Sequence, residues 1–325
     1  MNNPLLSIIV PIYNVEPYLE DCLLSIVTQL EGQDEVEVIL VNDCSSDQSG
    51  TIAARYAEEY EQLKYFSHQQ NEGVSIARNT GINAANGSWV WFIDSVDWIE
   101  KDAIKTLLQL IEEHQEGDII CIQKKNDFQE YSIVNDIIPS PMSISGKQYL
   151  RSKLQKGVVV KFVAKRQFLL AHHLFFYPHI LHEDNLYNYI MLYYAKKLYV
   201  SDKPLYVKRC IRPGSIMNSI GERNAYDLMT IHRQLMIFMD KTVSQDDKDW
   251  FFKLSFLLIC RAYRIIGRTP GFSVFQDKNR EYVKSVCQEA FRYKGISFKA
   301  KVLFVRFFPR ILPFFEDIYS ALSKR

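Results

Sequence analysis

The feature that most constrains the fold is a series of short apolar runs in the first 125 residues, separated by segments with helical spacing. Residues 7–13 (SIIVPIY) and 36–41 (VEVILV) are runs of the kind found in buried strands. Between them, four apolar residues recur at helical spacing: Leu19, Leu23, Ile26 and Leu30. Strands that alternate with helices in this way predict βαβ units and a parallel sheet, so we expect an α/β fold.

The same alternation continues to about residue 123. The further strands that we expect lie at 64–67, 89–93 and 118–123. The further helices lie at about 47–60, 74–85 and 102–114. The first of these helices follows Ser45, Ser46 and Asp47, which are good helix-capping residues.

Beyond residue 125 the pattern weakens. A stretch rich in Pro and Ser lies at 137–146 (IIPSPMSISG), and from Glu222 onward the chain has helical patterns with aromatic-rich faces. The expected domains are an α/β domain at 1–220, with halves 1–125 and 126–220, and a helical region at 221–325.

Composition excludes several partners and compartments. The 39 Lys and Arg against 38 Asp and Glu leave a net charge of +1, which does not favour nucleic acid as a partner. The six cysteines form no CxxC pair and fit a reducing compartment. The apolar stretch 254–266 contains Arg261 and Arg264, and it is shorter than the roughly 20 residues of a spanning helix. We therefore expect a cytoplasmic protein that contacts a membrane only from its inner face.

Polar residues stand where the predicted strands end. Tyr13 and Asn14 follow the first strand, Asp43 follows the second, and Asp94 follows the fourth. Ligands of parallel sheets bind outside the carboxyl ends of the strands, so these residues are candidates for a binding site. Asp43 can accept a hydrogen bond from a base N–H; the alternative is that it belongs to an ordinary helix-capping turn.

The first strand is followed neither by GxGxxG nor by a phosphate-binding P-loop. This argues against a dinucleotide oxidoreductase and a P-loop kinase. The segment 71–79 (NEGVSIARN) instead opens a helix, with Arg78 one turn inside it. Free backbone N–H groups and this arginine can meet a diphosphate. The alternative is a surface helix with a solvated arginine.

Two pairs of carboxylates complete the set of candidates. Asp94 and Asp97 suit a hard cation beside substrate phosphates, or Asp94 caps a turn and Asp97 is solvated. Glu183 and Asp184 precede an apolar segment. They either serve the dipole of a helix or supply a base that deprotonates a hydroxyl. A basic turn follows at 212–217 (RPGSIM).

The order of these motifs along the chain resembles that of the family 2 glycosyltransferases. The segments that carry the resemblance are 7–14 with Glu16, 41–43, 71–79, 92–97, 182–184 and 212–217. The resemblance implies a GT-A fold with a Rossmann-like nucleotide-binding sheet, a donor-binding half at 1–125 and an acceptor half at 126–220. It also implies a UDP-sugar donor, a glycan or lipid-linked acceptor, and a role in building surface polysaccharide.

The resemblance further implies a role for each matching residue. The donor-binding residues would be Pro11, Tyr13 and Glu16 in the nucleoside pocket, Asp43 on the uracil ring, Arg78 near the diphosphate, Asp94 near the ribose or a metal, and Arg212 and Ser215 on a loop over the donor phosphates. Asp184 would be the catalytic base, with Glu183 supporting it. One base and a single in-line attack would give inversion.

Two positions depart from the family pattern. Cys44 replaces a glycine in the turn after the second strand. Val96 replaces the aspartate that serves as the direct metal ligand, and valine cannot coordinate a cation. Asp94 and Asp97 would then hold Mg²⁺ or Mn²⁺ through water and phosphate oxygens, or Arg78 and Arg212 would supply the positive charge instead.

Two other functions compete with this one. A catalytically impaired homologue that binds a donor or a partner is favoured by Val96 and opposed by the intact Glu183–Asp184 pair. A nucleotidyltransferase would need a glycine-rich loop with a basic residue directly after the first strand, and residues 11–14 (PIYN) are no such loop.

The C-terminal tail carries basic and bulky apolar residues side by side. Its basic residues are Arg292, Lys294, Lys299, Lys301, Arg306, Arg310, Lys324 and Arg325. Its apolar residues include Phe298, Leu303, Phe304, Phe307, Phe308, Leu312, Phe314 and Phe315. This composition suits a helix on an anionic membrane surface, broken by Pro309 and Pro313. The alternative is that the aromatic side chains pack into the protein.

Overall fold

A computed structural model describes residues 4–127, 141–152, 158–210, 221–267 and 269–310 of the 325-residue chain. The described chain forms two compact units. The first contains the described residues up to 210 except 180–182, and the second contains 180–182 and the described residues from 221 onward. The domain boundary expected at residue 220 falls within residues 211–220, which lie outside the described residues.

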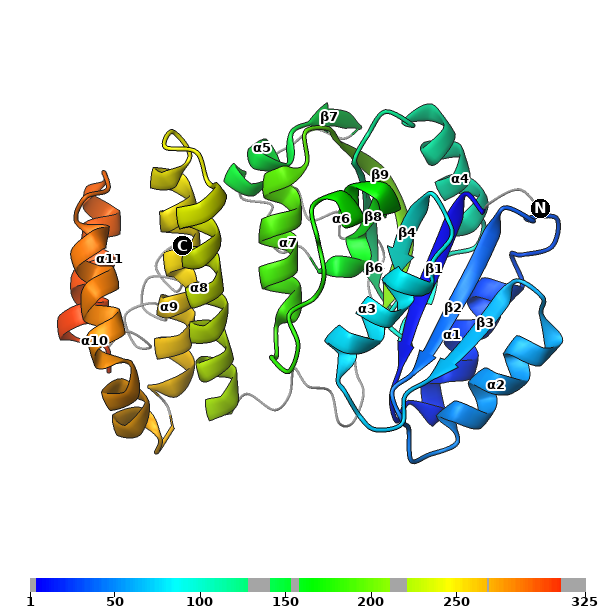
Figure 1. The fold of residues 1–325 in the computed structure, drawn as a ribbon, viewed down its shortest axis with the longest axis horizontal. Helices are drawn as coiled ribbons and strands as arrows, with labels where there is room; N and C mark the ends of the chain where they lie inside the picture. Colours follow the sequence, from blue (N-terminus) through cyan, green and yellow to red (C-terminus); the bar gives the residue numbers. More distant parts are fainter. Residues whose placement is uncertain (1–3, 128–140, 153–157, 211–220, 268, 311–325) are drawn as a thin grey trace. The chain divides into compact units, whose positions relative to one another are not determined.

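Four parallel strands open the first unit, as predicted. They are β1 (Leu6–Ile12), β2 (Val36–Asn42), β3 (Leu63–Ser67) and β4 (Trp89–Phe92), in the order β3-β2-β1-β4. The connecting helices are α1 (Glu16–Val27), α2 (Ser49–Glu59) and α3 (Val74–Ala84) (Figure 1). Every residue of β1, β2 and β4 is buried, because helices and neighbouring strands cover both faces of a parallel sheet.

The sheet then becomes mixed, which the sequence did not predict. β8 (Phe162–Lys165) pairs antiparallel with β4, and β6 (Ile119–Asn126) pairs antiparallel with β8. The expectation that the strand at 118–123 simply extends the parallel sheet is therefore wrong. β8 comes from the weakly patterned region and inserts between β4 and β6, and four residues are too few to give a periodic signal.

The remaining strands lie beyond β6. β9 (Leu198–Lys208) pairs parallel with β6, and both β5 (Trp98–Ile99) and β7 (Met142–Ile144) pair antiparallel with β9. The other helices of this unit are α4 (Ala103–Glu113), α5 (Gly146–Arg151), the 3₁₀ turn η1 (Val159–Lys161), α6 (Arg166–Ala171) and α7 (Glu183–Tyr194). The carboxyl ends of β1, β2, β4, β6 and β9 and the amino end of antiparallel β8 share one edge of the sheet.

Helix α3 packs on β1 and β2 at very short range. A Cβ atom added to Gly81 would lie 2.3 Å from Cγ2 of Ile9, a distance that side chains do not tolerate. Glycine at this position therefore lets the helix approach the sheet. This contact fixes the height of α3 above β1, and with it the place of Arg78 one turn earlier on the helix.

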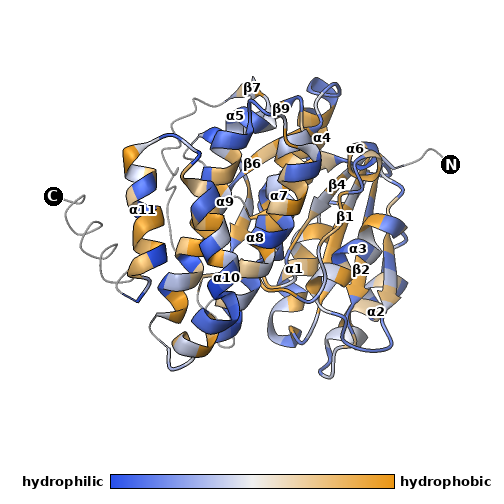
Figure 2. Ribbon diagram, turned by 60° about the vertical axis from the view of Figure 1, so that its left-hand side comes forward, coloured by the Kyte–Doolittle hydropathy of each residue, from blue (hydrophilic) through white to orange (hydrophobic). Residues whose placement is uncertain are grey.

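The second unit is helical, as expected. Its helices are α8 (Glu222–Thr242), α9 (Lys248–Ile266), α10 (Phe272–Ala290) and α11 (Ile296–Phe307). Aromatic side chains fill its interior, among them Phe252, Phe256, Tyr263 and Phe275. Figure 2 shows hydrophobic residues along the strands of the first unit and alternating hydrophobic and hydrophilic bands on these helices. None of the described helices is both long and apolar enough to cross a membrane.

Candidate active site

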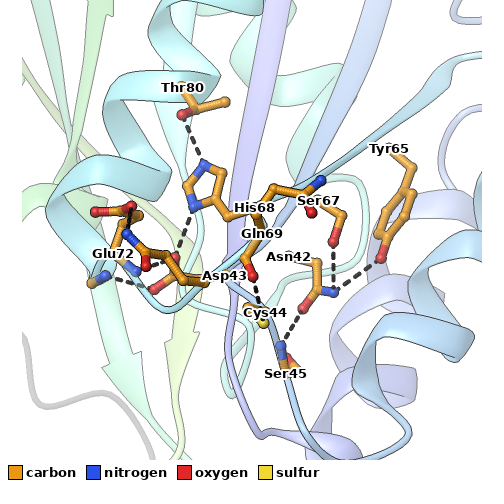
Figure 3. Close-up of polar contacts among 12 residues, drawn as sticks. Asn42, Asp43, Cys44, Ser45, Tyr65, Ser67, His68, Gln69, Glu72 and Thr80 are labelled. Carbon is orange, nitrogen blue, oxygen red and sulfur yellow. Dashed lines mark hydrogen bonds and ion pairs between the residues drawn. The ribbon is translucent and has the colours of Figure 1, made fainter.

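Asp43, at the end of β2, holds the turn that leads into α3. Its buried carboxylate accepts hydrogen bonds from the backbone N–H groups of Glu72 (2.9 Å) and Gly73 (2.7 Å) and lies 2.7 Å from Nδ1 of His68. Figure 3 shows His68 between Asp43 and Thr80, whose Oγ1 lies 3.0 Å from Nε2 of the imidazole. The sequence did not predict this role, and a contact of Asp43 with a uracil ring stays a prediction.

The turn after β2 explains the residue that departs from the family pattern. Cys44 has a φ of 59°, in the left-handed region that favours glycine. The backbone thus keeps the glycine-like conformation without the glycine. Asn42 supports the turn, since its side-chain amide donates to Tyr65 and Ser67 and its carbonyl oxygen accepts from the N–H of Ser45 (Figure 3).

The end of β1 lies against the same turn. Pro11 is buried in the strand, whereas Tyr13 is 47% exposed and presents its ring at the edge of the sheet. Glu16 accepts a hydrogen bond from the N–H of Gln48 (3.1 Å), and its own N–H donates to Asp47 (3.0 Å). Of the three residues predicted to line a nucleoside pocket, Tyr13 and Glu16 are exposed and Pro11 is buried, and the pocket itself stays a prediction.

Arg78 joins three separate parts of the first unit. Its guanidinium donates to Oε1 of Glu183 on α7 (2.6 Å) and to Oδ1 of Asp94 after β4 (2.9 Å). It also lies 5.1 Å from the centre of the Phe176 ring. The side chain is buried, so the alternative of a solvated surface arginine is wrong. Both terminal nitrogens are bonded to carboxylates, so Arg78 organises the site, and its place near a diphosphate stays a prediction.

This arrangement also keeps Arg78 charged. Burial alone would lower the pKa of the guanidinium, but the nearby charges of Asp94 and Glu183 outweigh burial and raise the pKa above its ordinary value. Arg78 is therefore a permanent cation at the centre of three carboxylates: Asp94, Glu183 and the adjacent Asp184.

Glu183 and Asp184 have different surroundings although they are neighbours in sequence. Glu183 is paired with Arg78, while Asp184 accepts a hydrogen bond from the side-chain amide of Asn185 (3.1 Å). Burial and the charge of Glu183 raise the pKa of Asp184 to about 7. A carboxylate with a pKa close to physiological pH is suited to take a proton from a hydroxyl group.

A cluster of aromatic rings packs against α7, the helix that carries both carboxylates. Phe176 and Tyr187 stack in parallel with ring centres 3.9 Å apart, and Phe92 meets the edge of each. Tyr187 lies one helical turn after Glu183 on α7, so this stack fixes the rotation of the helix that carries both carboxylates.

The alternative of a solvated Asp97 is wrong, while its role as a metal ligand stays a prediction. Asp97 is buried, one of its oxygens accepts from the hydroxyl of Tyr206 (2.5 Å), and the other accepts from the N–H of Arg209 (2.9 Å). Burial and the charge of Asp94 raise its pKa to about 6.

The rest of the predicted metal site is incomplete. Val96 is buried and cannot coordinate a cation, and only Asp94, whose side chain is 41% exposed, keeps one carboxylate oxygen clear of Arg78. Within the described ranges, no three His, Cys, Asp or Glu side chains gather as a metal ion would need. Binding of a cation by Asp94 and Asp97 through water and phosphate oxygens stays a prediction.

Arg209 is a further residue of the site that sequence reasoning missed. Its guanidinium lies 5.2 Å from the ring of Tyr18 and 4.8 Å from that of Trp98, and it pairs with Asp21 (2.8 Å). Its Nε donates to the carbonyl oxygen of Val96 (2.9 Å). Arg209 thus anchors the end of β9 to α1 and to the 94–97 turn. The predicted donor-loop residues Arg212 and Ser215 follow directly and lie outside the described residues.

The chain is similar to known glycosyltransferases. A family model described as Glycosyl transferase family 2 matches residues 7–170. EpsJ of Bacillus subtilis (strain 168), described as an uncharacterized glycosyltransferase, is 32% identical over 213 residues, which are 63% of this chain and 61% of EpsJ. Glycosyltransferase GlyA of Streptococcus pneumoniae serotype 4 is 46% identical over 110 residues, 34% of this chain and 15% of GlyA. The chain therefore spans less than two thirds of either relative.

A solved structure shares the fold. Residues 1–349 of TarS from S. aureus, in complex with UDP-GlcNAc, superpose with a TM-score of 0.64 at 24% sequence identity. The match covers 87% of this chain and 80% of the TarS chain. This similarity confirms the GT-A fold expected from the sequence, a mixed α/β sheet followed by a helical C-terminal region.

The geometry around Val96 predicts weak binding of divalent cations. In the presence of UDP, we expect Val96→Asp to bind Mn²⁺ more tightly than the wild type, because it adds a carboxylate beside Asp94. Val96→Asn is the matched control, since asparagine has the shape of aspartate without its charge. Calorimetric titration with Mn²⁺ measures both. Tight Mn²⁺ binding by the wild type, with no gain in Val96→Asp, would contradict the prediction.

Proposed function

Because the chain belongs to glycosyl transferase family 2, we propose that it is an inverting glycosyltransferase that moves a sugar from a UDP-sugar to a glycan or lipid-linked acceptor. The observation that carries the proposal is the Asp184 carboxylate, whose pKa of about 7 and place beside the Arg78–Glu183 pair suit a general base. The sugar is a hexose or an N-acetylhexosamine, by analogy with the UDP-GlcNAc bound to TarS.

The biological role follows from the relatives. EpsJ is one, and the minor teichoic acid biosynthesis protein GgaB of Bacillus subtilis is another, 40% identical over 117 residues. The name of GgaB supports a role for this chain in building a surface polysaccharide.

The donor would bind at the carboxyl ends of β1 and β2. The exposed ring of Tyr13 offers a face on which a base can stack, and Asp43 stands in the motif that contacts uracil in the family. The negative charge of the departing diphosphate needs positive partners. Arg212 and Ser215, in the segment that follows Arg209 and lies outside the described residues, are our candidates for that role.

The reaction is then a single displacement. Asp184 takes the proton of the acceptor hydroxyl while the oxygen of that group attacks the anomeric carbon, and UDP leaves with the bonding electron pair. Glu183 stays paired with Arg78, so its charge keeps Asp184 basic without competing for the proton. One displacement inverts the anomeric configuration.

A catalytically impaired homologue is the second candidate, and Val96 is the observation that favours it. The two functions are separated by incubating the protein with a panel of UDP-sugars and assaying release of UDP. NMR of the product from an α-linked donor should show a β-linkage. Retention of the α-configuration would contradict the proposed mechanism, and absence of turnover with every donor would favour the impaired homologue.

Changing Asp184 to Asn should abolish sugar transfer and spare donor binding. Loss of a general base costs about 10²–10⁴-fold in rate, whereas the nucleotide binds elsewhere. Folding raises the pKa of Asp184, so the folded state binds more protons than the unfolded state up to about pH 7, and ionised Asp184 opposes folding above that pH.

Asp184→Asn should therefore melt no lower than the wild type at pH 8. The measurements are initial rates, UDP affinity by calorimetry and thermal unfolding. Glu183→Gln is the comparison, since it leaves Arg78 without one partner and should lower the melting temperature. Wild-type transfer by Asp184→Asn would contradict the assignment.

We also propose that α11 lies on the anionic inner surface of the cell membrane. Ile296 (91% exposed), Leu303 and Phe307 (60% exposed) recur seven and eleven residues apart, on one face of the helix. Lys299 and Arg306 flank this face, and α11 contains no acidic residue. The opposite face packs into the unit through Val302 and Val305. Basic residues beside exposed apolar ones suit a helix on a membrane surface.

Part of the tail is nevertheless core, as the alternative expected. Phe298 packs edge-on against Phe252 and Phe256, so truncation after Gly295 would remove interior contacts. Other residues of the tail, from 311 to 325, lie outside the described residues. The surface must therefore be tested by point substitutions and not by deletion.

Replacing Leu303 and Phe307 with Ser should weaken binding to liposomes that contain phosphatidylglycerol by at least about tenfold. The wild type should bind more weakly at high salt, because salt screens the basic residues. Val274→Ser is the matched control, an exposed apolar residue on α10 of the same unit. Equal flotation of all three proteins with the liposomes, or none by the wild type at low salt, would contradict the proposal.

A further inference from the structure

Three lysines lie near the edge of the sheet that is formed by the carboxyl ends of β6 and β9 and the amino end of β8. Lys124 on β6 stands opposite Tyr206 of β9, and Asn126 stands opposite Lys208. Paired residues share a face of the sheet, as do residues two apart on one strand, so Lys124 and Lys208 point to the same side as diagonal neighbours. Lys161 is the last residue of η1, directly before β8.

These lysines have no carboxylate partners. Within the described ranges, none of the three forms an ion pair, although Lys161 is only 7% exposed. Lys125, the next residue on β6, points to the other face and pairs with Glu100 at 2.6 Å. Burial together with the charges of Lys208 and Lys161 lowers the pKa of Lys124.

The nearby acids offset the cluster only in part. The charge of Asp97 raises the pKa of Lys124, but burial and the charges of Lys208 and Lys161 outweigh it. Asp127 accepts from the N–H of Cys210. Three cations therefore face this edge with an excess of positive charge, and crowded cations of this kind are stabilised when an anion binds.

The place of the cluster separates it from the nucleotide. Tyr206, opposite Lys124, contacts both Asp97 and the N–H of Asp94, so the lysines lie beside the 94–97 turn. The residues assigned to the nucleoside end β1 and β2, on the far side of β4 in the strand order. An anion at the lysines would thus approach from the side opposite the nucleoside.

We propose that Lys124, Lys161 and Lys208 bind a phosphate group carried by the acceptor. This inference rests on the proposed function, because it takes the second substrate of a sugar transfer as the ligand. The acceptor would then be either a lipid diphosphate or a chain with phosphodiester groups. Both present the same oxyanion to the three ammonium groups. A phosphate ligand would account for three lysines that have no carboxylate partner among the described residues.

The test measures binding of inorganic pyrophosphate to protein saturated with UDP, so that the donor site is already filled. The wild type should bind pyrophosphate, more weakly as salt is raised. Lys124→Ala and Lys208→Ala should each weaken binding by about tenfold, the loss expected for one charge-assisted contact, while UDP affinity stays unchanged. Lys125→Ala is the matched control, since this lysine is paired with Glu100 and faces away.

Competition then identifies the source of the phosphate. Displacement of pyrophosphate by farnesyl diphosphate assigns a lipid diphosphate, and displacement by an oligomer of glycerol phosphate assigns a phosphodiester chain. The proposal is overturned if UDP-saturated protein ignores pyrophosphate, if neither competitor acts, or if the lysine substitutions weaken UDP binding instead. Because these assays need no turnover, their failure is distinct from failure to find a sugar donor.

Discussion

The ion pairs of Arg78 with Asp94 and Glu183 are the interaction on which the site depends. They connect α3, the end of β4 and the start of α7, three segments that are far apart in the sequence. Removing one partner of a buried ion pair costs about 3–5 kcal/mol, because the other charge stays buried without compensation. The close approach of α3 to β1 at Gly81 holds the arginine at the height where both carboxylates reach it.

The same interaction divides the work between two adjacent carboxylates. Glu183 neutralises Arg78, and its own negative charge then raises the pKa of Asp184. Two neighbouring acids thus acquire different roles from their surroundings alone, one fixed in an ion pair and one able to exchange a proton near neutral pH. The site obtains its base without a metal ligand at position 96, where valine stands.

Sequence reasoning predicted the donor half well and the interior of the site poorly. The strands β1 to β4 were predictable because each is a buried apolar run followed by a helix, and the polar residues at their ends follow from the geometry of parallel sheets. The insertion of β8 was not, because its pairing depends on partners about 40 and 70 residues earlier in the chain.

The same limit applies to single residues. The sequence did not show that Asp97 bonds to Tyr206 and to the N–H of Arg209, because both residues follow it by more than a hundred positions. A solvated Arg78 was an open alternative because its partner Glu183 lies 105 positions away. The sequence predicts which chemistry a motif can perform, whereas the hydrogen-bond partners that set its role are known only from the fold.

The coupling between Glu183 and Asp184 is the central claim, and the pH dependence of kcat/KM tests it most directly. Asp184 acts as a base only when deprotonated, so the rate should fall about tenfold per pH unit below an apparent pKa near 7 and level off above it. Glu183→Gln removes the negative charge that raises the pKa of Asp184, while Arg78 remains. The fall in kcat/KM on the acid side should therefore move to lower pH. An acid limb that stays in the same place in Glu183→Gln would contradict the account.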